Sequence, residues 1–384
     1  MKKALLFFLI LFSFSAKAIE LSDSSRISLL TCSPGSDELY SIFGHTGIRV
    51  TDYRQGFDVV FNYGTFDFTK PGFYLNFCRG ILIFMVSVDR FQDFRSQYIY
   101  EERNIYEQEL LLANEDKQRM FAFLANNALP EHCEYRYDFL YDNCATRVRD
   151  VIEKYSGKGF QSHFDGFPVK SFRDLINDYS AHHLWDQFGM NLLIGLPVDV
   201  ITTPRQECFL PDYLSQAVAQ ATINGAPLAA KKILILDAAK NPDGSGFEGT
   251  PNMVFGILLA LAFLLTALEF QQGRYFVAFD TVLFGIAGLL GTLFFTLWFF
   301  TQHTTPAWNL NLLWAWPTHL PVAFMLPFWK KFPFLRHYLL AAGIAALGMT
   351  LFGRWMPQHF LWANLMISAV FAIRSLAFWK RTTS

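Results

Sequence analysis

The sequence predicts an exported α+β domain followed by an all-α bundle of five transmembrane helices. Three observations support this division. The first 18 residues have the pattern of a secretory signal peptide, most charged residues lie between positions 19 and 250, and long apolar runs recur from 251 to 384. The 52% hydrophobic content and the 42 phenylalanines of this 384-residue chain exceed what a soluble protein carries, so part of the chain is expected in lipid.

The N-terminus has the three regions of a signal peptide. Lys2 and Lys3 precede an apolar run over residues 4–14, and the small-residue sequence Ala-Lys-Ala follows at 16–18. Cleavage is expected after Ala18. The alternative is an uncleaved anchor helix, but the apolar run is shorter than the roughly 20 residues that a membrane span needs.

Short stretches of alternating apolar and polar residues predict the strands of the exported domain, 19–250. Residues 47–51 and 59–63 form a hairpin pattern, and the turn residues Tyr-Arg-Gln-Gly at 53–56 separate them. Another apolar segment, 81–88, predicts a third strand.

Three helices are predicted in the same domain. Apolar residues recur at helical spacing over 114–127, and Pro130 ends that helix. The next helix begins after Asn143, a favourable N-cap, and a further helical run covers 171–179. Residues 241–251 are rich in Pro and Gly and are expected to form a linker into the membrane.

Five apolar runs predict the membrane helices, some of them only marginally long enough to span. They cover residues 253–270, 279–300, 310–328, 338–352 and 360–378. Lys and Arg are concentrated in alternate loops and at the C-terminus, whereas the other two loops hold only Arg354. This charge asymmetry predicts a cytoplasmic C-terminus, which agrees with an exported domain before the first span.

The composition also limits the partners and the chemistry. A formal net charge of −1 gives no reason to expect a nucleic-acid partner. There is no CxxC and no HExxH motif, so no metal or other cofactor is expected. Disulfides are permitted outside the cytoplasm, but the spacing of the cysteines assigns no pair, and their odd number leaves at least one thiol free. The five are Cys32, Cys78, Cys133, Cys144 and Cys208.

Cys144 is the candidate nucleophile of a papain-like thiol site. It follows Asn143 and therefore lies in the first turn of the helix that this residue caps. Free N–H groups and the positive end of the helix dipole stabilise a thiolate there, and Arg147 adds positive charge. The same N–H groups can form an oxyanion site. The alternative is a small buried residue, the commoner role of a lone cysteine in a helix.

His45, at the start of the first strand of the hairpin, is the candidate base. A thiol that attacks an acyl carbon needs a group that takes its proton and returns one to the leaving group, and histidine does this near neutral pH. The partner strand returns antiparallel and brings Asn62 near the imidazole. Asn62 is therefore the candidate orienting group, with Tyr63 as second choice. The alternative is a histidine that is merely hydrogen-bonded at the end of a strand.

Several motifs of the chain form a recognisable set. They are Phe43-Gly44-His45-Thr46 with Arg49, Phe61-Asn62-Tyr63-Gly64, Tyr137-Asp138-Phe139, Asp142-Asn143-Cys144-Ala145-Thr146-Arg147, and Trp308 to Pro317 at the outer edge of the third span. Together they resemble the Lnb family, the lipoprotein N-acyltransferases of Bacteroides-type bacteria. The resemblance covers nearly the whole mature chain, and the Gly-His and Asn-Cys motifs are its most specific parts. The order of His before Cys is also similar to the permuted papain-like fold of the lecithin:retinol acyltransferase group.

The resemblance implies a function for the candidate residues. Cys144 would carry an acyl chain from a phospholipid or similar donor as a thioester, and His45 would be the general base. The chain would pass to the α-amine of the diacylglyceryl cysteine of an apolipoprotein. The protein would then be a multi-pass protein of the bacterial inner membrane with its catalytic domain in the periplasm, in contact with membrane lipids, and it is expected to be a monomer.

Two groups of residues are expected to bind substrate. Arg49, Tyr63, Asn143 and Arg147 surround the candidate nucleophile and base in the sequence motifs. At the outer end of the membrane bundle, a polar rim would recognise a lipid headgroup or a lipoprotein terminus, and the alternative there is a simple aromatic belt. The residues of this rim are Asn309, Asn311, Trp314 and His319.

Other functions remain open at this point. A cell-wall amidase or endopeptidase would use the same Cys144 and His45, although it has no need of five spans. A lipid hydrolase would share the thioester and differ only in the acceptor. A membrane sensor or scaffold with a relic site is the alternative that involves no catalysis.

Overall fold

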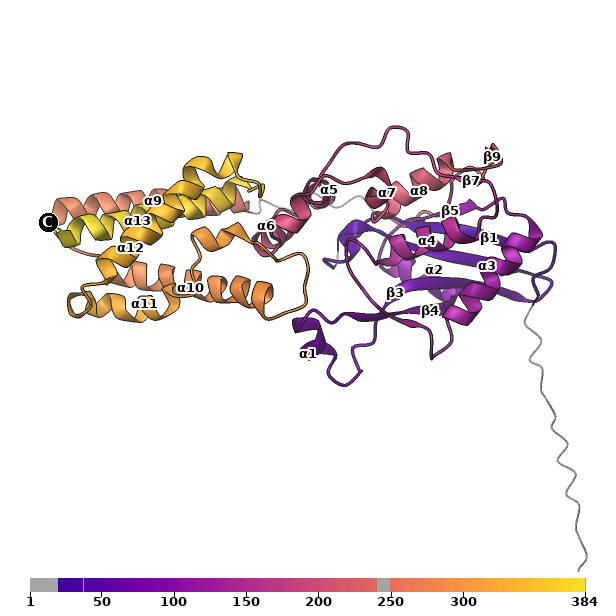
Figure 1. Cartoon of the computed structure of the whole chain (residues 1–384), viewed down its shortest axis with the longest axis horizontal. Coiled ribbons are helices and arrows are strands. Elements are labelled where there is room, and N and C mark those ends of the chain that lie inside the picture. The colour runs from indigo at the N-terminus through magenta and orange to yellow at the C-terminus, as the bar shows by residue number, and fades with distance from the viewer. Residues whose placement is uncertain (1–19, 37, 240–248, 384) are drawn as a thin grey trace, which may run out of the picture.

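The computed structural model describes residues 20–36, 38–239 and 249–383 (Figure 1). The expected signal peptide and most of the expected linker lie outside these residues. An α+β domain and a bundle of long helices are arranged end to end (Figure 1). The C-terminus lies at the end of the bundle that is farther from the α+β domain.

An antiparallel sheet of seven strands, in the order β10-β5-β1-β2-β3-β4-β6, forms the centre of the α+β domain. The predicted hairpin is confirmed, because β2 pairs antiparallel with β3 and Ile48 lies opposite Phe61. The third predicted strand corresponds to β4, which lies next to β3. The strands are β1 (Arg26–Cys32), β2 (His45–Asp52), β3 (Phe57–Thr65), β4 (Ile83–Arg90), β5 (Ile105–Glu109), β6 (Glu134–Arg136) and β10 (Ile233–Leu236).

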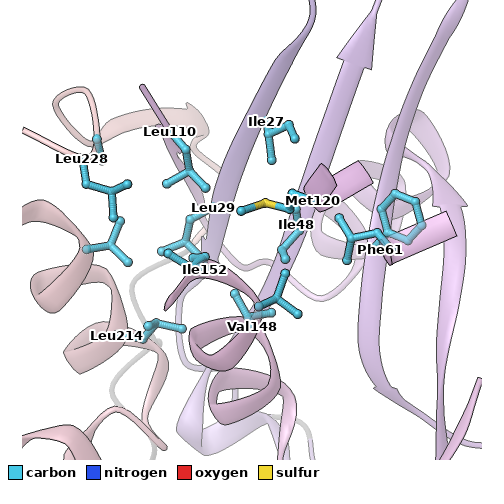
Figure 2. Packing of buried hydrophobic residues seen from close by; sticks show 14 of the residues in the cluster. Ile27, Leu29, Ile48, Phe61, Leu110, Met120, Val148, Ile152, Leu214 and Leu228 are labelled. Atoms are coloured by element: carbon cyan, nitrogen blue, oxygen red, sulfur yellow. The ribbon is translucent and has the colours of Figure 1, made fainter. Parts of the chain in front are cut away.

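Helices cover both faces of this sheet. On one face, Ile27 and Leu29 of β1 pack with Val148 of α4 and Met120 of α3, and Figure 2 shows these side chains grouped together. On the other face, Leu30 and its neighbours pack against α2. The apolar residues of β1 thus point to both faces, which is the pattern of a strand that is buried on both sides. The covering helices are α2 (Phe91–Tyr100), α3 (Asn114–Asn127), α4 (Cys144–Tyr155) and α8 (Pro211–Gln220).

The three predicted helices of the domain are confirmed as α3, α4 and α5 (Phe172–Tyr179). Ser171 caps α5 and forms a capping box with Asp174. Three short strands form a second, separately hydrogen-bonded sheet in the order β7-β8-β9. The remaining elements of the domain are η1 (Ser41–Phe43), α1 (Phe73–Cys78), α6 (Leu184–Leu193), η2 (Leu196–Asp199), α7 (Pro204–Glu207), β7 (Phe160–Gln161), β8 (Thr222–Ile223) and β9 (Ala226–Pro227).

Four helices of the described chain are long and apolar enough to cross a membrane: α9 (Pro251–Gln272), α10 (Val277–Phe299), α12 (Leu335–Phe352) and α13 (Trp362–Thr383). Four of the five expected membrane spans are therefore confirmed as long helices. The third expected span, 310–328, is instead broken into η3 (Leu310–Leu313), α11 (His319–Met325) and η4 (Leu326–Lys331). Pro317, Pro321 and Pro327 lie within this segment, and proline removes a backbone donor and clashes with the preceding helical turn.

The broken segment still connects the two ends of the bundle. The loop after α10 contacts the α+β domain through the N–H of Gln302, which donates to the carbonyl of Arg79 over 2.7 Å. The loop after α12, with η5 (Gly353–Trp355), also returns to the domain, where the N–H of His359 donates to Asp199. Segment 310–331 must therefore run from the end near the domain to the far end, and its irregular backbone is tolerated because it packs against α10 inside the protein.

A fixed junction joins the domain to the bundle. Arg173 of α5 is fully buried and bonds to Asp199, Asn191 and the carbonyl of Gly195. Next to it, the N–H of Gly195 donates to the carbonyl of Thr305, 2.8 Å away, in the loop after α10. These bonds orient the sheet with respect to the membrane helices.

Candidate active site

The N-terminus of α4 positions Cys144. Asn143 caps the helix: its Oδ1 accepts the N–H of Thr146 at 2.9 Å, and the Thr146 hydroxyl oxygen accepts the N–H of Asn143 at 2.7 Å. The amide nitrogen of Asn143 also donates to the carbonyls of Phe139 and Phe209. Because Cys144 is the first helical residue, its own N–H has no acceptor within the helix and can serve an oxyanion.

The strands β2 and β3 bring an imidazole to this thiol. His45 begins β2, and Asn62 and Gly64 lie near the end of β3. Gly64 has a φ of 92°, in the left-handed region that favours glycine. A Cβ atom at this position would lie 3.4 Å from the Cβ of Cys144 and 4.0 Å from Cε1 of His45. The backbone conformation therefore favours glycine here, and the strand lies in van der Waals range of both reactive side chains.

A chain of hydrogen bonds runs from the thiol into the sheet. The amide nitrogen of Asn62 donates to Asp89 at 3.0 Å, and Ser87 donates to the same carboxylate oxygen. The amide oxygen of Asn62 consequently faces His45, whose Nε2 donates to it over 2.6 Å. Nδ1 is the ring nitrogen left for the hydrogen bond with Cys144. The geometry thus fixes the orientation and the tautomer of the imidazole.

The electrostatics favour a thiolate paired with an imidazolium. Burial raises the pKa of Cys144, but the charge and hydrogen bond of His45 and hydrogen bonds from Thr46 outweigh it, so the net pKa is lowered. Burial lowers the pKa of His45, but Cys144 and the hydrogen bond to Asn62 outweigh it, so the net pKa is raised. These opposite shifts are typical of an activated thiol.

A cavity of about 280 Å³ opens above the pair. Cys144 and His45 are half-buried at its surface. One part of the lining is an aromatic wall made of two groups of rings, Phe66–Phe84–Tyr137 and Phe43–Phe139, in which neighbouring ring centroids lie between 4.3 and 4.9 Å apart. The other part is polar and comes from η1, the end of α2 and the residues that follow it: Ser41, Gln97, Glu101 and Arg103.

Comparisons with known protein families identify both parts of the chain. Residues 15–178 match the model described as the Lnb N-terminal periplasmic domain, and residues 243–383 match the Lnb transmembrane domain, whose name counts five transmembrane helices. The chain belongs to the Lnb family. Lnb proteins are a family of lipoprotein N-acyltransferases. The two domain matches also identify this chain as a membrane protein with a periplasmic domain and several transmembrane helices. Searches of the curated proteins and of the solved structures found no match.

Cys144, His45 and Asn62 all lie within the match to the Lnb periplasmic domain, and the structure brings the three together. Asn143 also lines the cavity, where it supports the helix cap. All five cysteines are free thiols, and Cys144 is therefore available as a nucleophile.

Three predicted substrate-binding residues of the Lnb periplasmic domain lie away from the cavity. Arg49 pairs with Asp58 and Glu107. Tyr63 is buried on the face of β3 opposite to Asn62 and donates a hydrogen bond to Asn127. Arg147 pairs with Asp142 and covers the ring of Tyr135. In the structure these side chains have partners within the protein and no contact with the cavity surface.

The expected polar rim of the Lnb transmembrane domain is buried inside the protein instead. Asn309 donates to the carbonyl of Leu192 at 2.7 Å and accepts the N–H of Asn311. The amide oxygen of Asn311 accepts the indole N–H of Trp314, and His319 donates to the carbonyl of Trp314. All four side chains are at least 98% buried. They differ from the expectation because helix α6 of the periplasmic domain covers Asn309 and Asn311, whereas Trp314 and His319 pack against Phe371 of α13 inside the bundle. No surface of these side chains is left for a substrate.

Several groups of the site were not predicted from the sequence. Asp89 completes the hydrogen-bond chain, Thr46 stabilises the sulfur, and Arg103 lines the cavity. An indication existed for Thr46, which is adjacent to His45 in the Gly-His motif. Asp89 comes directly after the third predicted strand, 81–88, but the alternation of that strand does not tell which residue Asp89 pairs with.

Proposed function

We propose that this chain transfers a fatty acyl chain from a glycerophospholipid to the α-amine of the diacylglyceryl cysteine at the N-terminus of apolipoproteins. The observation that carries the proposal is the hydrogen-bonded set Cys144, His45 and Asn62 beside an aromatic cavity. The match to both Lnb domains supports the reaction class.

The first half-reaction forms a thioester. The Cys144 thiolate attacks the ester carbonyl of the donor, and the N–H of Cys144 stabilises the oxyanion that develops. The bond between the carbonyl carbon and the glycerol oxygen breaks, and the His45 imidazolium gives its proton to that oxygen. The products are a lysophospholipid and an acyl-enzyme with a neutral His45.

The second half-reaction forms the amide. The neutral amine of the acceptor attacks the thioester carbonyl, and His45 takes a proton from the attacking nitrogen. Cys144 leaves as a thiolate, so the thiolate–imidazolium pair is restored. Asn62 accepts from Nε2 of His45 throughout both steps and keeps the imidazole in the orientation that both proton transfers need.

The surroundings of the cavity suit substrates that remain in a bilayer. Helix α1 exposes Tyr74, Leu75 and Phe77, which are between 49 and 68% accessible. Its C-terminal end lies beside the loop after α10, where the Phe77 ring contacts His303. Exposed aromatic side chains at this level are typical of a membrane interface. We infer that α1 contacts the outer leaflet and that an acyl chain enters the cavity along the aromatic wall.

The arrangement also supports a permuted papain-like fold for the catalytic domain. The base and its orienting residue come from adjacent strands early in the chain, and the nucleophile follows at the tip of a helix packed on the sheet. The orientation inferred from charge has Arg274, Lys330 and Lys380 on the cytoplasmic side, at the end of the bundle far from the domain.

Expression in a bacterial host that lacks its own lipoprotein N-acyltransferase tests the proposal. Mass spectrometry of lipoprotein N-termini should detect triacylated products with the wild-type chain and with Cys133→Ser, which changes a partly exposed thiol outside the cavity and outside α1. Cys144→Ala and His45→Ala should give diacylated products only, with unchanged amounts in the membrane. Triacylation by Cys144→Ala would refute the mechanism. Release of free fatty acid without triacylation would indicate a lipid hydrolase.

A further inference from the structure

Arg103 is a buried cation at the candidate active site whose hydrogen bonds are incomplete. Its side chain lines the cavity although the residue is only 4% exposed. Nε donates to the carbonyl of Ser33 at 2.8 Å, and Nη1 donates to Glu101 at 2.6 Å. Nη2 is buried and has no partner among the described residues. A buried donor without an acceptor is costly, so this nitrogen points to a ligand.

The neighbours of Arg103 leave Nη2 as the available donor. One oxygen of Glu101 accepts from Nη1 of Arg103, and the other accepts from Gln97 at 2.7 Å. The guanidinium covers the ring of Tyr98, 4.8 Å from its centroid. The carboxylate of Glu101 therefore holds the guanidinium in place beside the cavity, while Nη2 has no acceptor among the described residues.

We propose that Arg103 binds a phosphate oxygen of the glycerophospholipid acyl donor, an inference that rests on the proposed function. Hydrogen bonds between guanidinium and phosphate are charge-assisted and about twice as strong as neutral ones. In a glycerophospholipid, only the short glycerol backbone separates the ester carbonyls from the phosphate. With the carbonyl at Cys144 and the acyl chain along the aromatic wall, the phosphate falls in the polar part of the cavity.

The electrostatics of the site are consistent with an anionic donor. The positive charge of Arg103 opposes the protonated form of His45 and is one of the causes that lower its pKa. A phosphate bound to Arg103 would offset this charge and favour the imidazolium that protonates the leaving glycerol oxygen. Binding of the correct donor would thereby help the first half-reaction.

Phosphate recognition also solves a problem of selectivity. The acceptor itself carries two ester-linked acyl chains on a diacylglyceryl group, but it has no phosphate. An enzyme that recognised only an acyl ester would remove chains from the lipoproteins that it is meant to complete. Arg103 would distinguish the acyl donor from the lipoprotein during thioester formation, because only the acyl donor has a phosphate oxygen that accepts a hydrogen bond from Nη2.

The test compares two lipid donors with the purified full-length protein in detergent micelles. The donors are a phosphatidylethanolamine and a diacylglycerol with the same acyl chains, and the readout is the acyl thioester on Cys144, measured by mass spectrometry over time. We expect the wild type to react at least tenfold faster with the phospholipid. Arg103→Gln should lose at least tenfold with the phospholipid and react with the diacylglycerol at the wild-type rate. Arg103→Lys should retain part of the preference, because it keeps the charge.

Controls separate this role from a purely structural one. Arg149→Gln removes another buried arginine, which pairs with Asp150 outside the cavity, and should keep the full donor preference. A short soluble acyl thioester should load Cys144 equally in wild type and Arg103→Gln, which checks that the variant is folded and that its thiol is intact. If Arg103→Gln fails this check, Arg103→Lys carries the comparison.

Three results would overturn the inference. The first is an equal loss of the loading rate with both donors in Arg103→Gln, and the second is a wild type that loads both donors at the same rate. The third is a defect of Arg103→Gln that is confined to transfer from the preformed thioester to a lipopeptide amine, which would assign Arg103 to binding of the acyl acceptor. The proposed function fails separately, if the wild type forms a thioester from neither lipid.

Discussion

Replacement of Asn62 by alanine tests the central geometric claim about the site. The change removes the amide oxygen that accepts from Nε2 of His45 over 2.6 Å and leaves the thiol, the imidazole and the cavity walls in place. It also removes the donor to Asp89, which keeps its hydrogen bond from Ser87. We expect a folded protein with an imidazole that is free to rotate and to change tautomer.

The size of the effect follows from the hydrogen bond that is lost. A hydrogen bond to a charged group is worth about 1.5–3 kcal/mol. If the hydrogen bond to Asn62 reaches this strength when His45 is an imidazolium, its loss in Asn62→Ala should lower kcat/KM roughly 10- to 150-fold. The same bond raises the pKa of His45, so its loss should lower that pKa. The pH range in which thiolate and imidazolium coexist then becomes narrower on its alkaline side.

The assay is the rate of thioester formation on Cys144 as a function of pH, followed by mass spectrometry. Ser156→Ala is a matched control, because it removes one buried hydrogen bond at the opposite end of α4, from the Ser156 hydroxyl to the carbonyl of Ile152. It should cost about 1 kcal/mol of stability and leave the rate unchanged. If Asn62→Ala forms the thioester within twofold of the wild-type rate, and the alkaline side of its pH–rate profile is unchanged, Asn62 does not orient the base.

Three further predictions follow from other contacts. Thr46→Val should raise the pKa of Cys144, because it removes a hydroxyl that stabilises the thiolate. The pH dependence of thiol alkylation measures this pKa, and an unchanged value would contradict the role of Thr46. Arg173→Ala should cost about 3–5 kcal/mol, because it leaves buried Asp199 unpaired, so a thermal midpoint equal to wild type would be inconsistent with the junction. Phe77→Asp should reduce transfer between lipids in vesicles at least tenfold while loading from a soluble thioester is retained, and equal losses in both assays would argue against membrane contact by α1.

Local sequence patterns predicted the core of the candidate site. The cap residue Asn143 defined the start of α4, and therefore the position of Cys144 in its first turn. The alternation of the hairpin defined the antiparallel return of β3, which brings Asn62 to His45. Both depend on interactions between residues that are close in sequence, and these are the interactions that periodicity and capping report.

The contacts that depend on tertiary packing were not predictable in this way. Arg103 is 70 positions away from Ser33, whose carbonyl its Nε bonds, and no spacing rule relates the two. The polar side chains of the expected rim, such as Asn309 and Asn311, are recognised in the sequence only as polar groups near an interface. Whether such groups bind a substrate or a neighbouring domain depends on helix α6, which covers them in the structure.

The junction around Arg173 makes bilayer thickness a variable of the reaction. Because the bonds of this junction tie the domain to the helices, the height of the sulfur above the lipid depends on how deeply the bundle sits in the membrane. A bundle in a thinner or thicker bilayer tilts or shifts to match its apolar belt. Lipids of unsuitable chain length would then slow catalysis by vertical displacement alone, even when their ester and headgroup chemistry is ideal.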